Sequence, residues 1–319
     1  DRYSRSHKKT CREIWIFMKL SSTNIVGKGA QKFGSLLIEH LQDYGVKIVD
    51  KSQKSDIHLS VIKGFKPGSK NVLRLDGVYY DIGRLKLNNP IRDSIKRSDG
   101  VIYQSEWCKV FAEGMLNVKA KKIACIHNGT RAIPESTPIN KYGFDKIFIS
   151  CAVWRVNKRL EAMVRAFLIA IKRVGGNIGF CIAGKPDYAL EHSNIKYLGH
   201  VADLRSLYKS ADYMCHICHL DACPNSVVEG LCAGIPVLCN NIGGTPELVG
   251  ESGIVLPLDS PFDFKPIKNM KKVGSIDVDI LADGMVEMMT RDWNVNRPDL
   301  DIAVSAKKYY EFFKEVLSV

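Results

Sequence analysis

One segment of the sequence, residues 220–237, holds the densest set of groups that could bind an anionic ligand. It contains two carboxylates, Asp221 and Glu229, with seven residues between them. A proline precedes an expected helix over residues 226–233, and Ser226 is placed to cap that helix, with Glu229 completing a capping box. Capping accounts for Ser226 and Glu229 but leaves Asp221 unexplained. Because the N–H groups and dipole of a helix start attract anions, the segment predicts an anion site at the mouth of a cleft.

A second glycine-rich loop follows the next expected strand, over residues 235–239. It contains Gly243 and Gly244 and continues into another helix start at Thr245. Paired glycines let a backbone approach a ligand closely. Since this loop and the preceding helix start both follow the carboxyl ends of strands, we expect them to share one phosphate pocket.

The chain around these loops alternates short apolar runs with helical patterns, which indicates parallel sheets covered by helices on both faces. The first half is expected to hold strands at 13–18, 46–49, 56–62, 100–104 and 122–126 and a helix at 30–43, followed by a linker over 128–142. The second half is expected to hold strands at 146–152, 178–183, 213–218 and 235–239, helices at 158–173, 203–210 and 226–233, and a last helix at 303–317. These two series predict two doubly wound α/β domains that bind ligands in the cleft between them.

The net positive charge of the chain comes entirely from residues 1–140. The 319 residues include 46 Lys and Arg against 34 Asp and Glu, for a net charge of +12. Residues 1–140 carry 25 basic and 13 acidic side chains, whereas residues 141–319 carry 21 of each. Such a surplus predicts an anionic partner, with a merely solubilising basic face as the alternative.

The composition also restricts the class of protein. A hydrophobic fraction of 45% and a charged fraction of 25% are typical of a globular protein and exclude collagen, coiled-coil and disordered chains. No apolar run approaches the ~18–20 residues that span a bilayer. Ten cysteines spread along the chain are typical of reduced thiols in a cytoplasmic protein. We therefore expect a cytoplasmic location, with peripheral membrane attachment as an option.

The order of these motifs resembles that of a known enzyme family. Asp221 to Glu229, then Gly234-Ile235-Pro236-Val237 and Gly243-Gly244-Thr245-Pro246-Glu247, resemble the donor-site signature of the retaining family 4 glycosyltransferases (glycosyl transferases group 1) with the GT-B fold. Supporting similarity lies in Cys181–Gly184, Tyr197–Val201, Leu207–Asp212 and Ile126–Gly129. The resemblance implies two Rossmann-like domains facing across a cleft. We expect an acceptor-side domain over 1–135, a nucleotide-sugar domain over 136–302, and a helix at 303–319 that packs back on the first domain.

The resemblance also implies roles for single residues in the second domain. Glu229 would bind the ribose hydroxyls, and Asp221, at a position where the family has Glu, would bind the donor sugar. Lys158 falls at the family's lysine for the diphosphate; Val153 occupies the position of its arginine, and we expect Arg155 to substitute. A solvated helix start is the alternative for these cations. The remaining expected donor contacts are Gly184, Val201, Asn225, Ser226, Val227, Gly243, Gly244 and Thr245.

Fewer residues of the first domain match the family. Gly27 and Gly29 resemble its glycine loop beside the donor phosphates. Asp76 sits where the family often has a His or Asp that faces the acceptor, so it could receive the proton of the acceptor or orient its hydroxyl. A turn built on Asp76-Gly77 is the structural alternative.

The expected activity is transfer of a hexose from a nucleotide diphosphate sugar, UDP-glucose being typical, to an acceptor hydroxyl with retention. The resemblance implies no metal and no cofactor. The charge surplus favours an anionic acceptor: a modified DNA base, an acidic glycan or a membrane lipid. A sugar-nucleotide epimerase and a non-catalytic sugar-nucleotide-binding protein are the alternatives.

One further pattern points to different chemistry. Cys215-His216-Ile217-Cys218-His219 matches a haem-attachment sequence, and with Cys223 it is compatible with zinc. The segment fits a buried strand, and no second Cys/His pair has ligand spacing. We therefore expect neither haem nor a structural zinc site.

Overall fold

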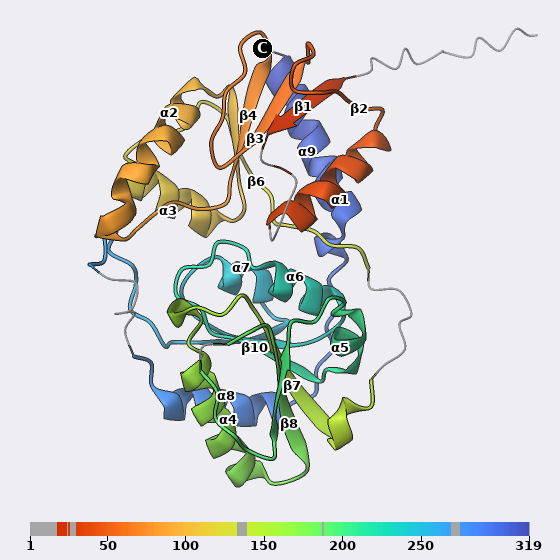
Figure 1. The fold of residues 1–319 in the computed structure, drawn as a ribbon, viewed down its shortest axis with the longest axis vertical. Helices are drawn as coiled ribbons and strands as arrows, with labels where there is room; N and C mark the ends of the chain where they lie inside the picture. The colour runs from red at the N-terminus through yellow and green to blue at the C-terminus, as the bar shows by residue number, and fades with distance from the viewer. Residues whose placement is uncertain are drawn as a thin grey trace, which may run out of the picture.

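The computed structural model describes residues 18–23, 25, 30–132, 139–186, 188–268 and 275–318. Its described strands form two parallel sheets of six strands each, one above the other in Figure 1. The first sheet has the order β2-β1-β3-β4-β5-β6. Its strands are β1 (Lys19–Thr23), β2 (Lys47–Ile48), β3 (Ile57–Val61), β4 (Lys70–Leu75), β5 (Gly100–Tyr103) and β6 (Ile123–Cys125).

The second sheet has the order β12-β11-β10-β7-β8-β9, again parallel throughout. Its strands are β7 (Lys146–Cys151), β8 (Ile178–Ala183), β9 (Ile195–Gly199), β10 (Tyr213–His216), β11 (Val237–Asn240) and β12 (Gly253–Leu256). Strands β7, β8, β10 and β11 are almost wholly buried, as expected of parallel strands covered on both faces.

Nine α-helices lie within the described residues. They are α1 (Ala30–Gln42), α2 (Asn89–Arg97), α3 (Glu106–Leu116), α4 (Leu160–Val174), α5 (Arg205–Ser210), α6 (Asn225–Cys232), α7 (Thr245–Val249), α8 (Val278–Thr290) and α9 (Ile302–Leu317). Three helices have side-chain N-caps, which accept hydrogen bonds from backbone N–H groups of the first turn. These caps are Ser105 before α3, Asp277 before α8 and Asp301 before α9.

The last helix covers the first sheet, although the preceding 150 or so residues build the second. In Figure 1, α9 lies beside α1 against strands β1, β3 and β4. Its apolar face, including Tyr309 and Phe313, is buried in the same core as Leu37 and Leu59. The expected domain boundary at 135–136 falls outside the described residues.

The second sheet is covered on both faces. Helices α4 and α8 pack together on one face, around Phe148 and Phe167. Helices α5, α6 and α7 cover the other face, where Leu207, Leu231 and Leu248 are buried. No described helix is long and apolar enough to cross a membrane. The nine cysteines in the described ranges are free thiols, in agreement with the expectation that they form no disulfide framework.

Most of the expected elements of the second half are confirmed, with shifts of one or two residues at their ends. The first expected strand, at 13–18, lies outside the described residues except for Met18, which precedes β1; β1 begins at Lys19. Helix α4 begins at Leu160 rather than at residue 158, because Arg159 adopts a left-handed conformation with φ of 51°.

Candidate active site

A cleft of about 610 Å³ lies where the carboxyl ends of the two sheets meet. Asp76 follows β4 and Gln104 follows β5 on one side; Ala152 follows β7 and Gly184 follows β8 on the other. Ligands of doubly wound sheets bind at this edge. The cleft is therefore the expected place for a substrate, and the following residues line it: Asp76, Gln104, Asn128, Cys151, Ala152, Val153, Arg155, Asn157, Lys158, Ala183, Gly184, His200, Val201, Leu204, Tyr208, Leu220, Asp221, Ala222, Cys223, Pro224, Asn225, Ser226 and Glu229.

Lys158 and Asp221 form an ion pair in this cleft, with 2.5 Å between Nζ and Oδ2. Burial lowers the pKa of Lys158, but the Asp221 carboxylate outweighs that effect and the pKa is raised. Burial likewise raises the pKa of Asp221, but the charge and the hydrogen bond of Lys158 outweigh it, so the pKa of Asp221 lies below its ordinary value. Both groups are therefore charged at neutral pH, and each holds the other in place.

Arg155 lies on the same side of the cleft and is exposed. Within the described residues it makes no ion pair, unlike Lys158. Val153, the residue at the family's arginine position, is 76% exposed and lines the cleft without a charge. The structure thus places one unneutralised cation, Arg155, and one paired cation, Lys158, on the same wall.

The capping role that was expected for Ser226 and Glu229 is wrong. Helix α6 begins one residue earlier than predicted, and its N-cap is Pro224, with no side-chain cap. Pro224 has no backbone N–H group that could donate a hydrogen bond to the Glu229 carboxylate, so a capping box cannot form. The buried Glu229 instead accepts a hydrogen bond of 3.0 Å from the Tyr208 hydroxyl. Because Ser226 and Glu229 lie inside the helix, both can face the cleft, which they line.

The second glycine loop lies behind the cleft lining rather than in it. The Gly244 N–H donates to the carbonyl of Asp221 over 2.8 Å, and a Cβ added to Gly243 would collide with that same carbonyl. Thr245 and Val227 are buried. The described lining of the cleft therefore does not include four of the predicted donor contacts, Val227, Gly243, Gly244 and Thr245. The two glycines allow the loop to pack against the backbone of Asp221.

Two other predicted glycine positions have different outcomes. Gly184 lines the cleft with φ of 103°, and a Cβ there would collide with the carbonyl of Ala152. Only glycine fits at this close approach of β7 and β8. Gly27 and Gly29 lie outside the described residues. Val201 and Asn225 line the cleft as expected.

Asp76 is held by side chains of its own domain rather than forming a turn. Its Oδ1 accepts hydrogen bonds from the fully buried Arg74 and, over 2.5 Å, from Gln104. Arg74 also donates to Asn128 over 2.7 Å, and Asn128 donates to Asn225 over 2.8 Å. A chain of polar contacts therefore joins Asp76 to the first turn of α6 on the opposite side of the cleft.

Further hydrogen bonds fix the two sides of the cleft relative to each other. The Ser105 hydroxyl donates to the carbonyl of Ala222 over 2.9 Å. Glu247 accepts from the backbone N–H groups of Glu106 and Trp107 and so caps α3 from the other domain. Burial raises the pKa of Glu247, but bonds from His127 and from those N–H groups outweigh it and lower the pKa. This carboxylate is therefore charged at neutral pH.

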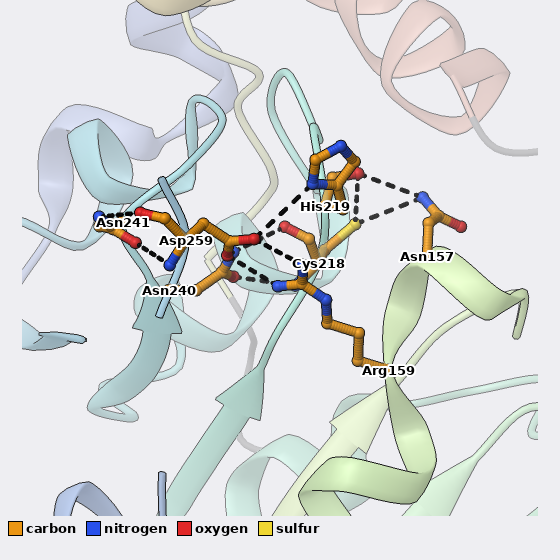
Figure 2. Close-up of polar contacts among 7 residues, drawn as sticks. All are labelled: Asn157, Arg159, Cys218, His219, Asn240, Asn241 and Asp259. Atoms are coloured by element: carbon orange, nitrogen blue, oxygen red, sulfur yellow. Dashed lines mark hydrogen bonds and ion pairs between the residues drawn. The ribbon is translucent and has the colours of Figure 1, made fainter. Parts of the chain in front are cut away.

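A buried polar network that the sequence pattern does not predict surrounds Arg159, next to Lys158 in the chain (Figure 2). Arg159 donates two hydrogen bonds, of 2.7 and 2.5 Å, to the carboxylate of Asp259. Asn240 donates to the same carboxylate over 2.6 Å, and His219 lies 3.7 Å from it. Despite burial, these partners lower the pKa of Asp259. The only signal in the sequence was a run of cations before α4, which does not identify a partner 100 residues later.

Asn157 completes the support of this loop. Its backbone carbonyl accepts a 2.9 Å hydrogen bond from the His219 N–H, and its side chain donates toward the His219 carbonyl and the Cys218 sulfur (Figure 2). Lys158 thus lies between Asn157, which is bonded to the segment after β10, and Arg159, which is bonded to Asp259 in the loop after β12. These contacts hold the residues on both sides of Lys158 in place.

The architecture and the cleft define the GT-B class: two facing Rossmann-like sheets with the ligand site between them. Comparison with solved structures agrees. A HepE protein of Anabaena in complex with UDP and glucose superimposes with a TM-score of 0.64 at 14% identity, covering 93% of this chain and 100% of that one. A glycosyltransferase from Rickettsia africae gives 0.60 at 14% identity, covering 94% and 98%. At these identities the comparison shows the fold.

A family model narrows the class for part of the chain. Residues 145–265 match the model described as Glycosyl transferases group 1. The O-antigen chain mannosyltransferase B of Escherichia coli is 35% identical over 63 residues, which are 19% of this chain and 16% of that protein. The sequence similarity to this curated relative therefore covers a small part of its length. The similarity to Glycosyl transferases group 1 therefore lies in the part of the chain that forms the second sheet.

Proposed function

We propose that this protein is a retaining glycosyltransferase that moves a hexose from a nucleotide diphosphate sugar, with a UDP-sugar as the favoured donor, to an acceptor hydroxyl. The observation that carries the proposal is the grouping in one cleft of Arg155, Lys158, Glu229 and the first turn of α6. Cations and a helix start suit a diphosphate, and a buried carboxylate suits ribose hydroxyls. Complexes of the Anabaena neighbour with UDP and with UDP-glucose support the choice of nucleotide.

The cleft would accelerate transfer by stabilising the leaving group. As the bond between the sugar and the diphosphate breaks, negative charge grows on the diphosphate oxygens. Arg155, Lys158 and the N–H groups of the α6 start would oppose that charge in a fixed arrangement. Asp221, held by Lys158, keeps a second oxygen, Oδ1, for hydroxyls of the sugar.

The acceptor would approach from the side of Asp76. Its hydroxyl oxygen would form a bond to the anomeric carbon on the face from which the diphosphate departs, which preserves the configuration. The proton of the hydroxyl would pass to the departing phosphate oxygen. Asp76 would orient the hydroxyl through Oδ2, because Oδ1 already accepts from Arg74 and Gln104.

A donor-turnover assay tests this function. The protein is incubated with UDP-glucose, other UDP-hexoses and GDP-mannose, with and without acceptors, and the released nucleoside diphosphate is measured. A glycosyltransferase releases it with at least one donor and faster with its acceptor. An epimerase converts the donor without such release. If neither release nor conversion rises above background for any donor, the catalytic proposal is wrong and a binding protein remains.

Replacing Glu229 with alanine should weaken donor binding by about 100-fold or more, because two charge-assisted hydrogen bonds to ribose are lost. Calorimetric titration with the nucleoside diphosphate measures the effect. Tyr208→Phe removes only the hydroxyl that donates to Glu229 and should cost much less. The exposed Glu251→Ala is the matched control. An affinity within threefold of the wild type in Glu229→Ala would show that the ribose lies elsewhere.

The acceptor is proposed to be anionic, because the whole surplus of positive charge lies in residues 1–140, on the acceptor side. Raising the salt concentration from 50 to 200 mM should then weaken acceptor binding by about tenfold or more. Labelled donor offered to DNA with hydroxymethylated bases, to anionic lipid vesicles and to acidic oligosaccharides identifies which accepts the sugar. An affinity for the labelled acceptor that does not change with salt would contradict the electrostatic proposal.

A further inference from the structure

Three side chains with metal-binding atoms converge behind Lys158. His216 ends β10, and Cys218 and Asp221 lie on the loop that follows. One ligand atom of each lies within 4.8 Å of the other two. The Asp221 Oδ2 is 3.9 Å from the Nε2 of His216 and 3.9 Å from the Sγ of Cys218. Asp221 lines the cleft, whereas His216 and Cys218 are buried beneath it.

The His216 ring supplies an independent indication of a ligand. The side chain is only 4% exposed, yet its Nε2 has no hydrogen-bond partner among the described residues. Burial, followed by the nearby charge of Lys158, lowers the pKa of His216 to about 3, so the ring is neutral. A buried imidazole nitrogen that lacks a partner costs free energy unless something binds it.

A cation already occupies the open side of this cluster. The Lys158 ammonium bonds Asp221 and also interacts with the sulfur of Cys218. Its side chain lines the open cleft, so it can leave this position by rotating into solvent. The cluster is thus arranged around positive charge that is not permanently attached to it.

We propose that His216, Cys218 and Asp221 form a Zn²⁺ site that competes with the Lys158 ammonium for the same ligands. A tetrahedral zinc ion would need about 3.4 Å between the nitrogen and oxygen ligands and about 3.6 Å between sulfur and oxygen, which are a few tenths of an ångström less than observed. Nitrogen, thiolate and carboxylate are all zinc ligands, and the fourth position would be open to the cleft.

The exchange also balances in charge. Zinc binding requires Cys218 as a thiolate, so its thiol proton is released to solvent while Lys158 moves out with its charge. Before zinc binds, the charges of the Lys158 ammonium and the Asp221 carboxylate cancel. After zinc binds, the two positive charges of Zn²⁺ are cancelled by the Asp221 carboxylate and the Cys218 thiolate. Because zinc binding releases this thiol proton, it should strengthen as the pH rises.

The site differs from the zinc pattern that the sequence offered. Cys215 points into the apolar core under β10. The His219 Nδ1 faces the Asp259 carboxylate instead (Figure 2). The Cys-x-x-Cys-His pattern therefore does not converge; only Cys218 and the intervening His216 contribute, with an aspartate from outside it.

If the proposed function holds, zinc would inhibit it, because the ion removes Lys158 from the diphosphate and occupies Asp221. Metal binding itself does not depend on that function. The probe is Co²⁺, which reports a thiolate ligand through charge-transfer absorption in the near ultraviolet. Zn²⁺ affinity follows from displacement of the bound Co²⁺. The full chain should bind one equivalent with this absorption.

Two variants with opposite effects decide the proposal. Cys218→Ser should abolish the charge-transfer band and weaken Zn²⁺ binding by about 100-fold or more, beyond the loss for an outer-shell partner. Lys158→Met removes the competing ammonium and should tighten binding by about tenfold. Cys232→Ser, at a half-buried cysteine on α6, should leave both unchanged.

A band that persists in Cys218→Ser, or Zn²⁺ affinity that is unchanged in Lys158→Met, would overturn the site. Should Cys218→Ser fail to fold, the Lys158→Met result decides alone. Tight zinc binding by the wild-type chain, together with no activity of the zinc-free wild-type chain with any donor, would refute the proposed function and leave the metal site standing. The two proposals are thus separated by experiment.

Discussion

Lys158→Met should lower kcat/KM for sugar transfer by about 10²–10³-fold, the usual loss when one preorganised group that stabilises transition-state charge is removed. The methionine keeps the aliphatic stem in the cleft wall and removes the ammonium. The negative charge that Lys158 opposes develops as the diphosphate leaves, so most of the loss should appear in kcat rather than in KM. Steady-state kinetics with saturating acceptor measures the split.

The controls separate this effect from general damage. Lys172→Met removes an exposed cation of α4 and should leave the kinetics unchanged. Lys158→Arg retains the charge and should recover part of kcat. A variant that lost activity only through a raised KM would show that Lys158 binds the ground state and the transition state equally. That result would remove it from the catalytic step.

Asp259→Ala should lower the free energy of unfolding by about 3–5 kcal/mol, the range for breaking a buried ion pair at one end. The Arg159 and Asp259 side chains are only 6% and 8% exposed, and Asn240 bonds the same carboxylate. The substitution leaves the guanidinium charged and buried without this carboxylate. Urea denaturation followed by tryptophan fluorescence measures the loss, since Trp154 lies in the same domain core.

Two comparisons test the cause of that loss. Asp263→Ala removes an exposed carboxylate four residues later and should cost less than about 0.5 kcal/mol. The double variant Arg159→Leu/Asp259→Leu should be more stable than Asp259→Ala, because the buried guanidinium is removed together with the carboxylate. Because its folded pKa is lowered, Asp259 stabilises the fold above its unfolded pKa and loses that effect only as the pH falls through the lower value. If Asp259→Ala matches the exposed control, the pair contributes no stability.

The sequence was sufficient to predict the parallel architecture and most of the second sheet. In residues 146–239, continuous apolar runs alternate with helical patterns. Because buried parallel strands are continuous apolar runs, these runs predicted β7, β8, β10 and β11. Strand β4 and helices α2 and α3 were not predicted as elements; in β4, Arg74 interrupts the apolar run. Arg74 is nonetheless fully buried, paired with Asp76, a contact that only tertiary structure creates.

Within the site, too, local sequence patterns predicted some features, whereas others depend on tertiary contacts. Short-range patterns brought together Lys158, Asp221 and Glu229, which line one cleft; their roles in binding and catalysis stay predictions. The assignments based on local rules were less successful. Glu229 does not cap its own helix because Tyr208, from α5, bonds it instead. The Arg159–Asp259 pair depends on a left-handed residue at position 159 and on the loop after β12, neither of which has a signature in spacing.

The position of α9 affects the order in which the protein can be completed during synthesis. The ribosome releases all strands of the first sheet early, but the face that packs against Tyr309 and Phe313 stays uncovered until the last helix emerges. In the interval the whole second sheet is made and can fold independently. The apolar sheet face that α9 covers is therefore exposed in the nascent first domain while residues 126–301 are being synthesised.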